Sequence, residues 1–142
     1  MISSKLENLL KTGKLKADQV SQAEFDGMVL SGDRRLADAK HDSLSMASRF
    51  DLAYNASHAF ALAAMRWHGY RSNNRYLVFQ CLPLTLGLEA KLWRVLELCH
   101  RRRNLAEYEG YLDVEERLLE DLLRVTEELQ KVVAKLGAVS NE

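Results

Sequence analysis

Residues 43–67 read SLSMASRFDLAYNASHAFALAAMRW, and this stretch decides the fold. Apolar and small side chains recur in it at steps of three and four, which is the spacing of one helix face. They are Met46, Phe50, Ala53, Ser57, Phe60, Ala64 and Trp67. Because alanines fill several flanking positions too, the helix is apolar around much of its girth and belongs at the centre of a helical domain. We expect it to span Asp42 to Trp67 and to end at Gly69.

Two helix-start signals precede this central stretch. Ser21 and Glu24 have the spacing of a capping box, in which each side chain bonds the other residue's backbone N–H. Ser4 and Glu7 repeat that spacing and predict a short helical arm over residues 4–12. The inner face of the helix that begins at Ser21 is expected to include Phe25, Val29, Gly32 and Leu36.

Two further helices are expected after the central stretch. The polar residues 69–75 (GYRSNNR) predict a loop, and the apolar residues 76–82 (YLVFQCL) predict a short helix. Pro83 is expected to end that helix, because proline has no backbone N–H to continue it. A long helix should then run over residues 88–109, with Gly110 directly after its end.

The last helix has the most regular pattern in the chain. Asp113 and Glu116 form a third pair with capping-box spacing. An apolar residue then recurs every three or four positions, at Leu118, Leu122, Val125, Leu129, Val132 and Leu136. This stripe predicts a helix with one face in the core or against a second copy of the chain.

Together these patterns predict an all-α fold, an antiparallel four-helix up-down bundle with additional short helices. One proline and seven glycines among 142 residues are too few for the many turns that a fold of short strands would need. A chain of this length forms one core rather than two. We expect a single domain over residues 1–142, with an N-terminal helical arm over 1–17, the bundle core over 18–136 and a tail over 137–142.

The charge balance limits the partners that the whole molecule can attract. Twenty basic and twenty acidic residues give a formal net charge of +0, so no long-range field draws the chain to nucleic acid or anionic lipid. No apolar run approaches the roughly 20 residues that cross a bilayer. We expect no membrane partner, and we expect any nucleic-acid binding to be local.

The cysteines and histidines lack the spacings of metal sites. Cys81 and Cys99 form no CxxC pair, which favours two free thiols in a reducing, cytoplasmic setting. The histidines His41, His58, His68 and His100 have no HExxH companion, so neither a metal nor another cofactor is expected. His58 lies within the apolar central stretch and is expected to be a core residue.

Residues 99–111 read CHRRRNLAEYEGY and contain the candidate functional residues. At about 100° per residue, Arg103 falls close to the line of Leu96 and Cys99, and thus toward the core. Arg101 falls almost opposite and Arg102 on a flank, so the three arginines do not form one patch. A core-facing guanidinium needs a partner or an opening into a groove or subunit interface.

Two interpretations of Arg103 follow. In the structural one, Arg103 pairs with Glu107, four residues further on, while Arg101 and Arg102 are solvated. In the functional one, Arg103, Asn104 and Tyr108 line a phosphate-binding cleft, because the guanidinium fork suits phosphate oxygens.

The order of these elements resembles the HEPN superfamily of small prokaryotic helical-bundle proteins. The resemblance runs from about Phe25 to Leu136. It is carried by the central phrase RFDLAYNASHAFALAAMRWHGYR, the short apolar helix after it, and the arginine-asparagine motif late in the next long helix. Arg103 matches the family's arginine and Asn104 its usual polar residue. Tyr108 stands where the family's histidine is found.

The resemblance implies metal-independent RNA cleavage at a homodimer interface, as in a toxin-like endoribonuclease. It makes Arg103, Asn104 and Tyr108 the expected catalytic residues. Further contacts to RNA or a nucleotide are expected from His100, Arg101, Arg102, Glu107 and Tyr111. An antitoxin-like or nucleotidyltransferase-like protein is the expected partner in a two-gene module.

The tyrosine changes the expected chemistry. A histidine with a pKa near 6.5 exchanges protons around neutrality, whereas tyrosine with a pKa near 10 is a poor base. Tyr108 can still hold a phosphate or donate a proton. The alternative function is a noncatalytic helical scaffold that binds a protein partner through the same face.

Overall fold

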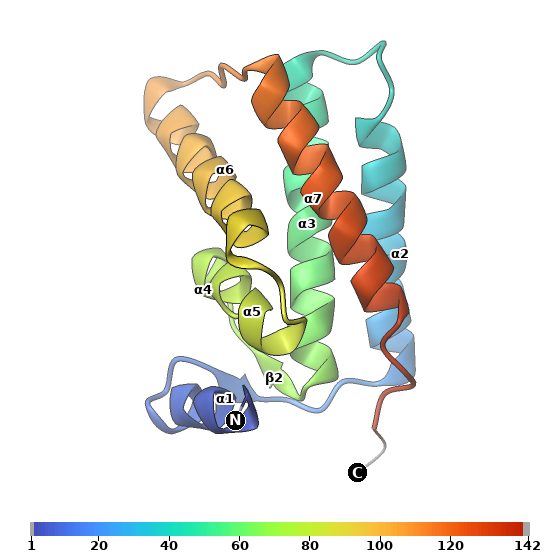
Figure 1. Ribbon diagram of the computed structural model, residues 1–142, viewed down its shortest axis with the longest axis vertical. Coiled ribbons are helices and arrows are strands. Elements are labelled where there is room, and N and C mark those ends of the chain that lie inside the picture. Colours follow the sequence, from blue (N-terminus) through green and yellow to red (C-terminus); the bar gives the residue numbers. More distant parts are fainter. Residues whose placement is uncertain (1, 141–142) are drawn as a thin grey trace.

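The computed structural model describes residues 2–140, in which the regular elements are helices apart from one pair of two-residue strands (Figure 1). The all-α prediction is therefore confirmed for this part of the chain, whereas residues 1, 141 and 142 of the predicted arm and tail lie outside it. The helices are α1 (Ile2–Lys11), α2 (Gln22–Ala39), α3 (Met46–Trp67), α4 (Arg75–Gln80), α5 (Leu82–Thr85), α6 (Ala90–Glu109) and α7 (Glu116–Ala134). The strands are β1 (Lys16–Ala17) and β2 (Tyr70–Arg71).

The long helices α2, α3, α6 and α7 alternate in direction along the chain (Figure 1). Helix α3 packs against both α2 and α7, while α4 and α5 fill the space beside its lower half in the figure. The larger residues of the predicted α3 stripe are fully buried at Phe50 and Phe60. Met46 was expected on this stripe but is 43% exposed, because it lies in the first turn of α3 at the end of the helix array.

Helices α2 and α3 pack closely where Gly32 meets Phe60. An added Cβ at Gly32 would lie 2.6 Å from the Phe60 ring, closer than side-chain atoms approach one another. Glycine is therefore required at position 32 by packing, although its backbone is ordinary helix. An added Cβ at Gly27 of the same helix would have no neighbouring atom within 4 Å.

Several predicted helix ends are confirmed. Ser21 caps α2 through the complete capping box with Glu24. Gly69 and Gly110 follow α3 and α6 with φ angles of +89° and +82°, the left-handed backbone that glycine adopts without strain.

Other predicted starts are wrong. Helix α3 is capped by Ser45 rather than starting at Asp42, because the Ser45 hydroxyl accepts from the Ser48 N–H at 3.1 Å. Helix α1 begins at Ile2, so the Ser4 to Glu7 pair lies inside it. Helix α7 begins after Glu115, which has no side-chain cap bond, so Asp113 does not form the predicted box.

The region after α3 also differs from expectation. Tyr70 and Arg71, predicted as loop, pair antiparallel with Ala17 and Lys16, which the chain brings alongside before α2. Pro83 does not end the apolar helix but lies in the first turn of the separate helix α5, where a missing N–H removes no helical bond.

The N-terminal arm is docked on the bundle. Leu6 of α1 and Leu15 of the following loop are each 1% exposed, and α1 lies against α5. The arm is thus part of the hydrophobic core. No helix among residues 2–140 has the length and apolar character of a membrane-spanning segment.

The two glycines of α2 give a matched test of the packing. Gly27→Ala should raise the free energy of unfolding by about 0.5–1 kcal/mol, because alanine is the better helix former and meets no neighbour. Gly32→Ala has the same helical advantage but should lower it by about 1–3 kcal/mol, since the methyl group forces Phe60 to move. Urea unfolding measures both. Equal stabilisation by the two alanines would show that the contact with Phe60 does not limit the packing.

Candidate functional site

The three arginines of α6 point in different directions, as the helical phase predicted. The Arg101 side chain is 69% exposed and bonds Glu97 one turn earlier, at 3.3 Å. Arg102 lies on the flank toward α7 and is 3.8 Å from the Glu115 carboxylate. Arg103 is 33% exposed and reaches toward α3.

Arg103 forms an ion pair with Asp51 of α3, and this contact defines the inner edge of the site. Its Nε lies 3.2 Å from the Asp51 Oδ1, and both atoms are inaccessible to solvent. They do not align as a hydrogen bond, so the attraction is mainly between the charges. The predicted pairing with Glu107 is wrong, because the phase of α6 turns Arg103 toward α3 rather than along its own helix.

One turn earlier on α6, His100 joins two other side chains. Its Nδ1 is 2.9 Å from the Tyr54 hydroxyl of α3, and its Nε2 is 3.1 Å from the Asn104 amide nitrogen. An amide nitrogen only donates, so Nε2 accepts, and the proton of the neutral ring is then on Nδ1, which donates to Tyr54. Tyr54, His100 and Asn104 thus form a chain of hydrogen bonds from the core to the surface.

Aromatic rings surround this chain on the side of α4. The His100 ring is 5.3 Å from the ring of Tyr76 and 6.3 Å from that of Phe79, between ring centres. The Arg75 guanidinium lies over the Tyr54 ring at 5.8 Å and donates to Asn55 at 2.9 Å. Helices α3, α4 and α6 therefore all contribute to the surroundings of His100.

Burial keeps the histidines of this region neutral. Burial, and the nearby positive charge of Arg75, lower the pKa of His100 below its ordinary value. The same causes, with His100 as a further one, lower the pKa of His58 to about 4. His58 is only half-buried and borders a groove between α2 and α3, so its prediction as a core residue is wrong.

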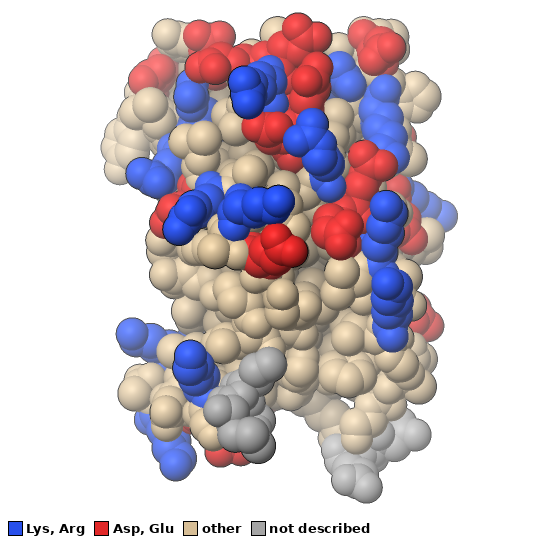
Figure 2. All heavy atoms as spheres, viewed as in Figure 1, with Lys and Arg blue, Asp and Glu red and all other residues tan. Residues whose placement is uncertain are grey.

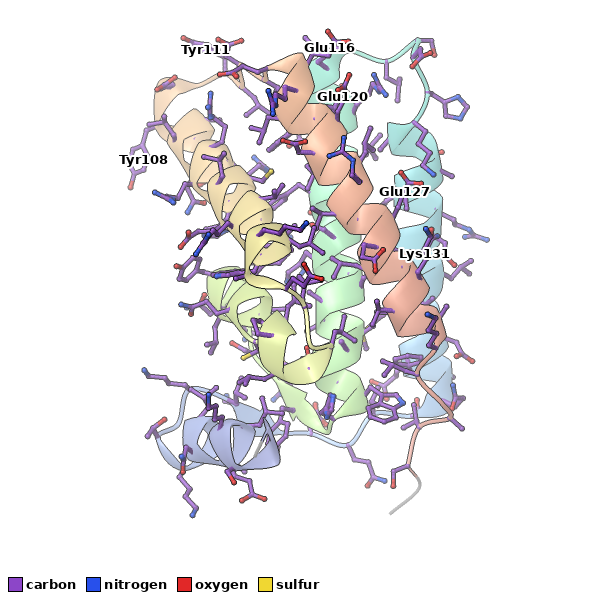
Figure 3. All side chains as sticks on the ribbon, in the orientation of Figure 1. Tyr108, Tyr111, Glu116, Glu120, Glu127 and Lys131 are labelled. Carbon is purple, nitrogen blue, oxygen red and sulfur yellow. The ribbon has the colours of Figure 1, made fainter. Side chains whose placement is uncertain are left out.

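The remaining predicted residues do not join this cluster within the chain. Tyr108 is 91% exposed and projects outward from α6 (Figure 3). Tyr111 lies in the loop after α6, beside a small hollow of about 130 Å³ that Arg102 also lines. Glu107 is exposed on the surface of α6. The structure thus brings His100 and Asn104 into contact and places Arg103 against α3 one turn away, whereas Tyr108 joins neither group.

Neither a reactive thiol nor a metal-binding cluster of cysteines and carboxylates is found among the described residues. Cys81 and Cys99 are free and buried, and burial raises their pKa to about 11 and about 12, so they stay protonated. Among residues 2–140, no group of three or more His, Cys, Asp or Glu side chains is arranged to hold a metal ion.

The surface near the site has no field of one sign. Figure 2 shows basic and acidic side chains interspersed over α6 and α7. This mixture agrees with the net charge of +0. Any anion bound here is therefore held by individual side chains rather than by a broad positive patch.

Sequence analysis did not identify Asp51 or Tyr54 as site residues. They lie three positions apart on α3 and reach Arg103 and His100 respectively. Residues three positions apart lie on the same face of a helix, so the sequence could place Asp51 and Tyr54 on one face of α3. It could not show which helix packs against that face.

Comparisons of the chain with protein-family models, with curated proteins and with solved structures find no match.

The low pKa of His58 predicts a loss of stability in acid. An unfolded histidine titrates near pH 6.5 and the native one near 4, so between these values the unfolded state binds more protons. The free energy of unfolding should therefore fall by about 2 kcal/mol between pH 7 and pH 4.5 on account of this residue. Urea unfolding at both pH values should show the loss in the wild type but a smaller one in His58→Gln. His41→Gln, at an exposed position, serves as the control.

The Asp51 to Arg103 pair should orient the guanidinium more than it stabilises the fold. Both side chains are partly exposed, at 47% and 33%, so solvent weakens their attraction. A double-mutant cycle with Asp51→Ala and Arg103→Ala, followed by urea unfolding, should give a coupling of about 0.5–1 kcal/mol. A coupling above about 3 kcal/mol would instead mark a buried structural pair.

Proposed function

We propose that this protein is a HEPN-like RNA-targeting protein that acts as a homodimer around Arg103 and cleaves RNA without a metal. The observation that carries the proposal is that Arg103 and His100, one turn apart on α6, each contact α3, Arg103 through Asp51 and His100 through Tyr54, while Asn104 bonds His100. The proposal includes the HEPN-like four-helix up-down bundle, which the alternating directions of the long helices support.

The way in which Arg103 is held suits phosphate binding. The ion pair with Asp51 is through its Nε, and no hydrogen bond of its two terminal nitrogens is found among residues 2–140. The terminal nitrogens of an arginine form a fork that can bond two oxygens of one phosphate. In the proposal, Asp51 positions the guanidinium and the fork holds the scissile phosphate, where it also stabilises the charge that develops during cleavage.

His100 is the group best suited to be the base. Cleavage without a metal begins when a base removes the proton of the ribose 2′-hydroxyl, whose oxygen then attacks the adjacent phosphorus. A 2′,3′-cyclic phosphate forms as the bond from phosphorus to the 5′-oxygen breaks, and the departing 5′-oxygen takes up a proton from the protonated base or from water. The lowered pKa keeps His100 neutral at pH 7, and its Nε2 is the unprotonated nitrogen. Asn104 covers that nitrogen here, so the proposal requires the Asn104 amide to turn toward the substrate.

Tyr108 then has a different role from the histidine that it replaces in the resemblance. It is 91% exposed and lies one turn beyond Asn104. In the proposal Tyr108 and Tyr111 stack on RNA bases beside the cleft, because an exposed aromatic ring is a platform for unpaired bases. In the proposal, Arg101, Arg102 and Glu107 make further contacts to RNA from other sides of α6.

The second function is a noncatalytic interaction module, and one observation favours it. Leu98, Leu105 and Tyr108 are exposed by 44%, 50% and 91% along the outer side of α6. Apolar side chains along a helix suit a protein partner, such as an antitoxin-like or nucleotidyltransferase-like protein. RNA turnover separates this function from the first.

The test is cleavage of a fluorescent single-stranded RNA in the presence of a chelator, which removes any contaminating metal nuclease. Arg103→Ala should reduce cleavage at least about 100-fold, the typical effect of removing a group that stabilises the transition-state charge. Arg124→Ala is the matched control, because Arg124 is 73% exposed on α7 and pairs with Asp121 of its own helix. Circular dichroism should show equal helicity for both variants.

Two further variants separate the roles. His100→Gln should abolish cleavage but retain RNA binding in an anisotropy assay, whereas Tyr108→Phe should retain cleavage, since the ring still stacks. Full activity of Arg103→Ala, or no cleavage and no binding by the wild type, would contradict the proposal. RNA binding without turnover would contradict the cleavage step alone.

A further inference from the structure

A groove on a different side of α3 has features of a small-molecule site. It lies between α2 and α3, beside the start of α4, and has a volume of about 450 Å³. That volume lies within the range of roughly 300–1,000 Å³ that is typical of ligand pockets. The candidate RNA-binding face of α6 does not contribute to its lining.

Two arginines from different helices line this groove. Arg35 of α2 is bonded to the Ser31 hydroxyl, and Arg75 of α4 donates to the Asn55 side chain at 2.9 Å. No carboxylate pairs with either arginine within residues 2–140. Most other arginines of the structure do pair with Asp or Glu, namely Arg49, Arg66, Arg71, Arg101, Arg102, Arg103 and Arg124.

The antiparallel register of α2 and α3 places both arginines at the same end. Glu24 lies beside Arg66 and Gly32 beside Phe60, so Arg35 lies near the level of Asn55, to which Arg75 is bonded. The two guanidinium groups are thus held by neutral partners, and their remaining N–H groups are available to an anion.

The rest of the groove is apolar or neutral. Met28, Ala59 and Leu62 provide apolar lining, and Gly27 leaves the space above it open. His58 also lines the groove, where its low pKa leaves it uncharged at neutral pH. The one acidic side chain of the lining, Glu24, lies toward the far end and is 3.5 Å from Arg66, which compensates its charge.

We propose that this groove binds a small organic phosphate monoester, with its phosphate between Arg35 and Arg75 and its apolar body over Gly27 and Ala59. Charge and shape support the same orientation of such a ligand. The two guanidinium groups match the phosphate oxygens, and the apolar lining next to them matches a compact ring. This site is separate from the proposed RNA site, so either can fail without the other.

The test is a titration of the full chain with phenyl phosphate, followed by backbone amide NMR shifts. The shifts should be concentrated at the groove. Inorganic phosphate, which lacks the ring, and benzyl alcohol, which lacks the charge, should each bind at least about tenfold more weakly, equivalent to about 1.4 kcal/mol. Equal affinity for phenyl phosphate and inorganic phosphate would show that the apolar lining does not contribute to binding. Amide shifts concentrated outside the groove would show that the ligand does not bind there.

Three variants sharpen the result. Arg35→Gln should weaken binding roughly tenfold, since it removes a charged donor. Arg34→Gln is the matched control, because Arg34 is the exposed neighbour on the same helix and does not line the groove. Gly27→Leu should abolish binding by filling the groove, while the open space at its Cβ lets the helix fold. Equal weakening by Arg34→Gln and Arg35→Gln, or full binding by Gly27→Leu, would overturn the proposal.

Discussion

The close contact between Gly32 and the Phe60 ring is the constraint that sets how α2 packs on the central helix α3, and with it the groove between them. It brings the backbone of α2 against the central helix and fixes how the two helices slide along each other. The same register aligns Ala39 with Arg49, whose side chain donates to the Ala39 carbonyl at 2.8 Å, and Glu24 with Arg66. Because cores are close-packed, a shift of one helix by a single turn would break all of these contacts together.

Helix α3 connects the two sites. Asp51 and Tyr54 face α6 and hold Arg103 and His100, whereas Asn55, the next residue, faces the groove and holds Arg75. Arg75 itself lies over the Tyr54 ring, so its charge contributes to the low pKa of His100. A single buried helix thus positions polar groups on two of its sides, which is why its sequence mixes polar side chains with alanine and aromatic residues.

Much of the helical content could be predicted because helix formation is local. The capping box of Ser21, the glycines after α3 and α6, and the leucine stripe of α7 each depend on residues within a few positions of one another. The predictions failed where the chain contacts distant segments. Tyr70 and Arg71 became a strand because residues 16–17 lie beside them, and no local pattern contains that pairing.

The same division applies to the candidate site. The sequence by itself determined that Arg103 turns inward and Arg101 outward, because helical phase depends only on spacing along α6. Tertiary packing was needed to show that the partner of Arg103 is Asp51, that Tyr54 bonds His100, and that Arg35 and Arg75 share a groove. These contacts join helices separated by many residues, and the side chains that meet depend on how whole helices pack.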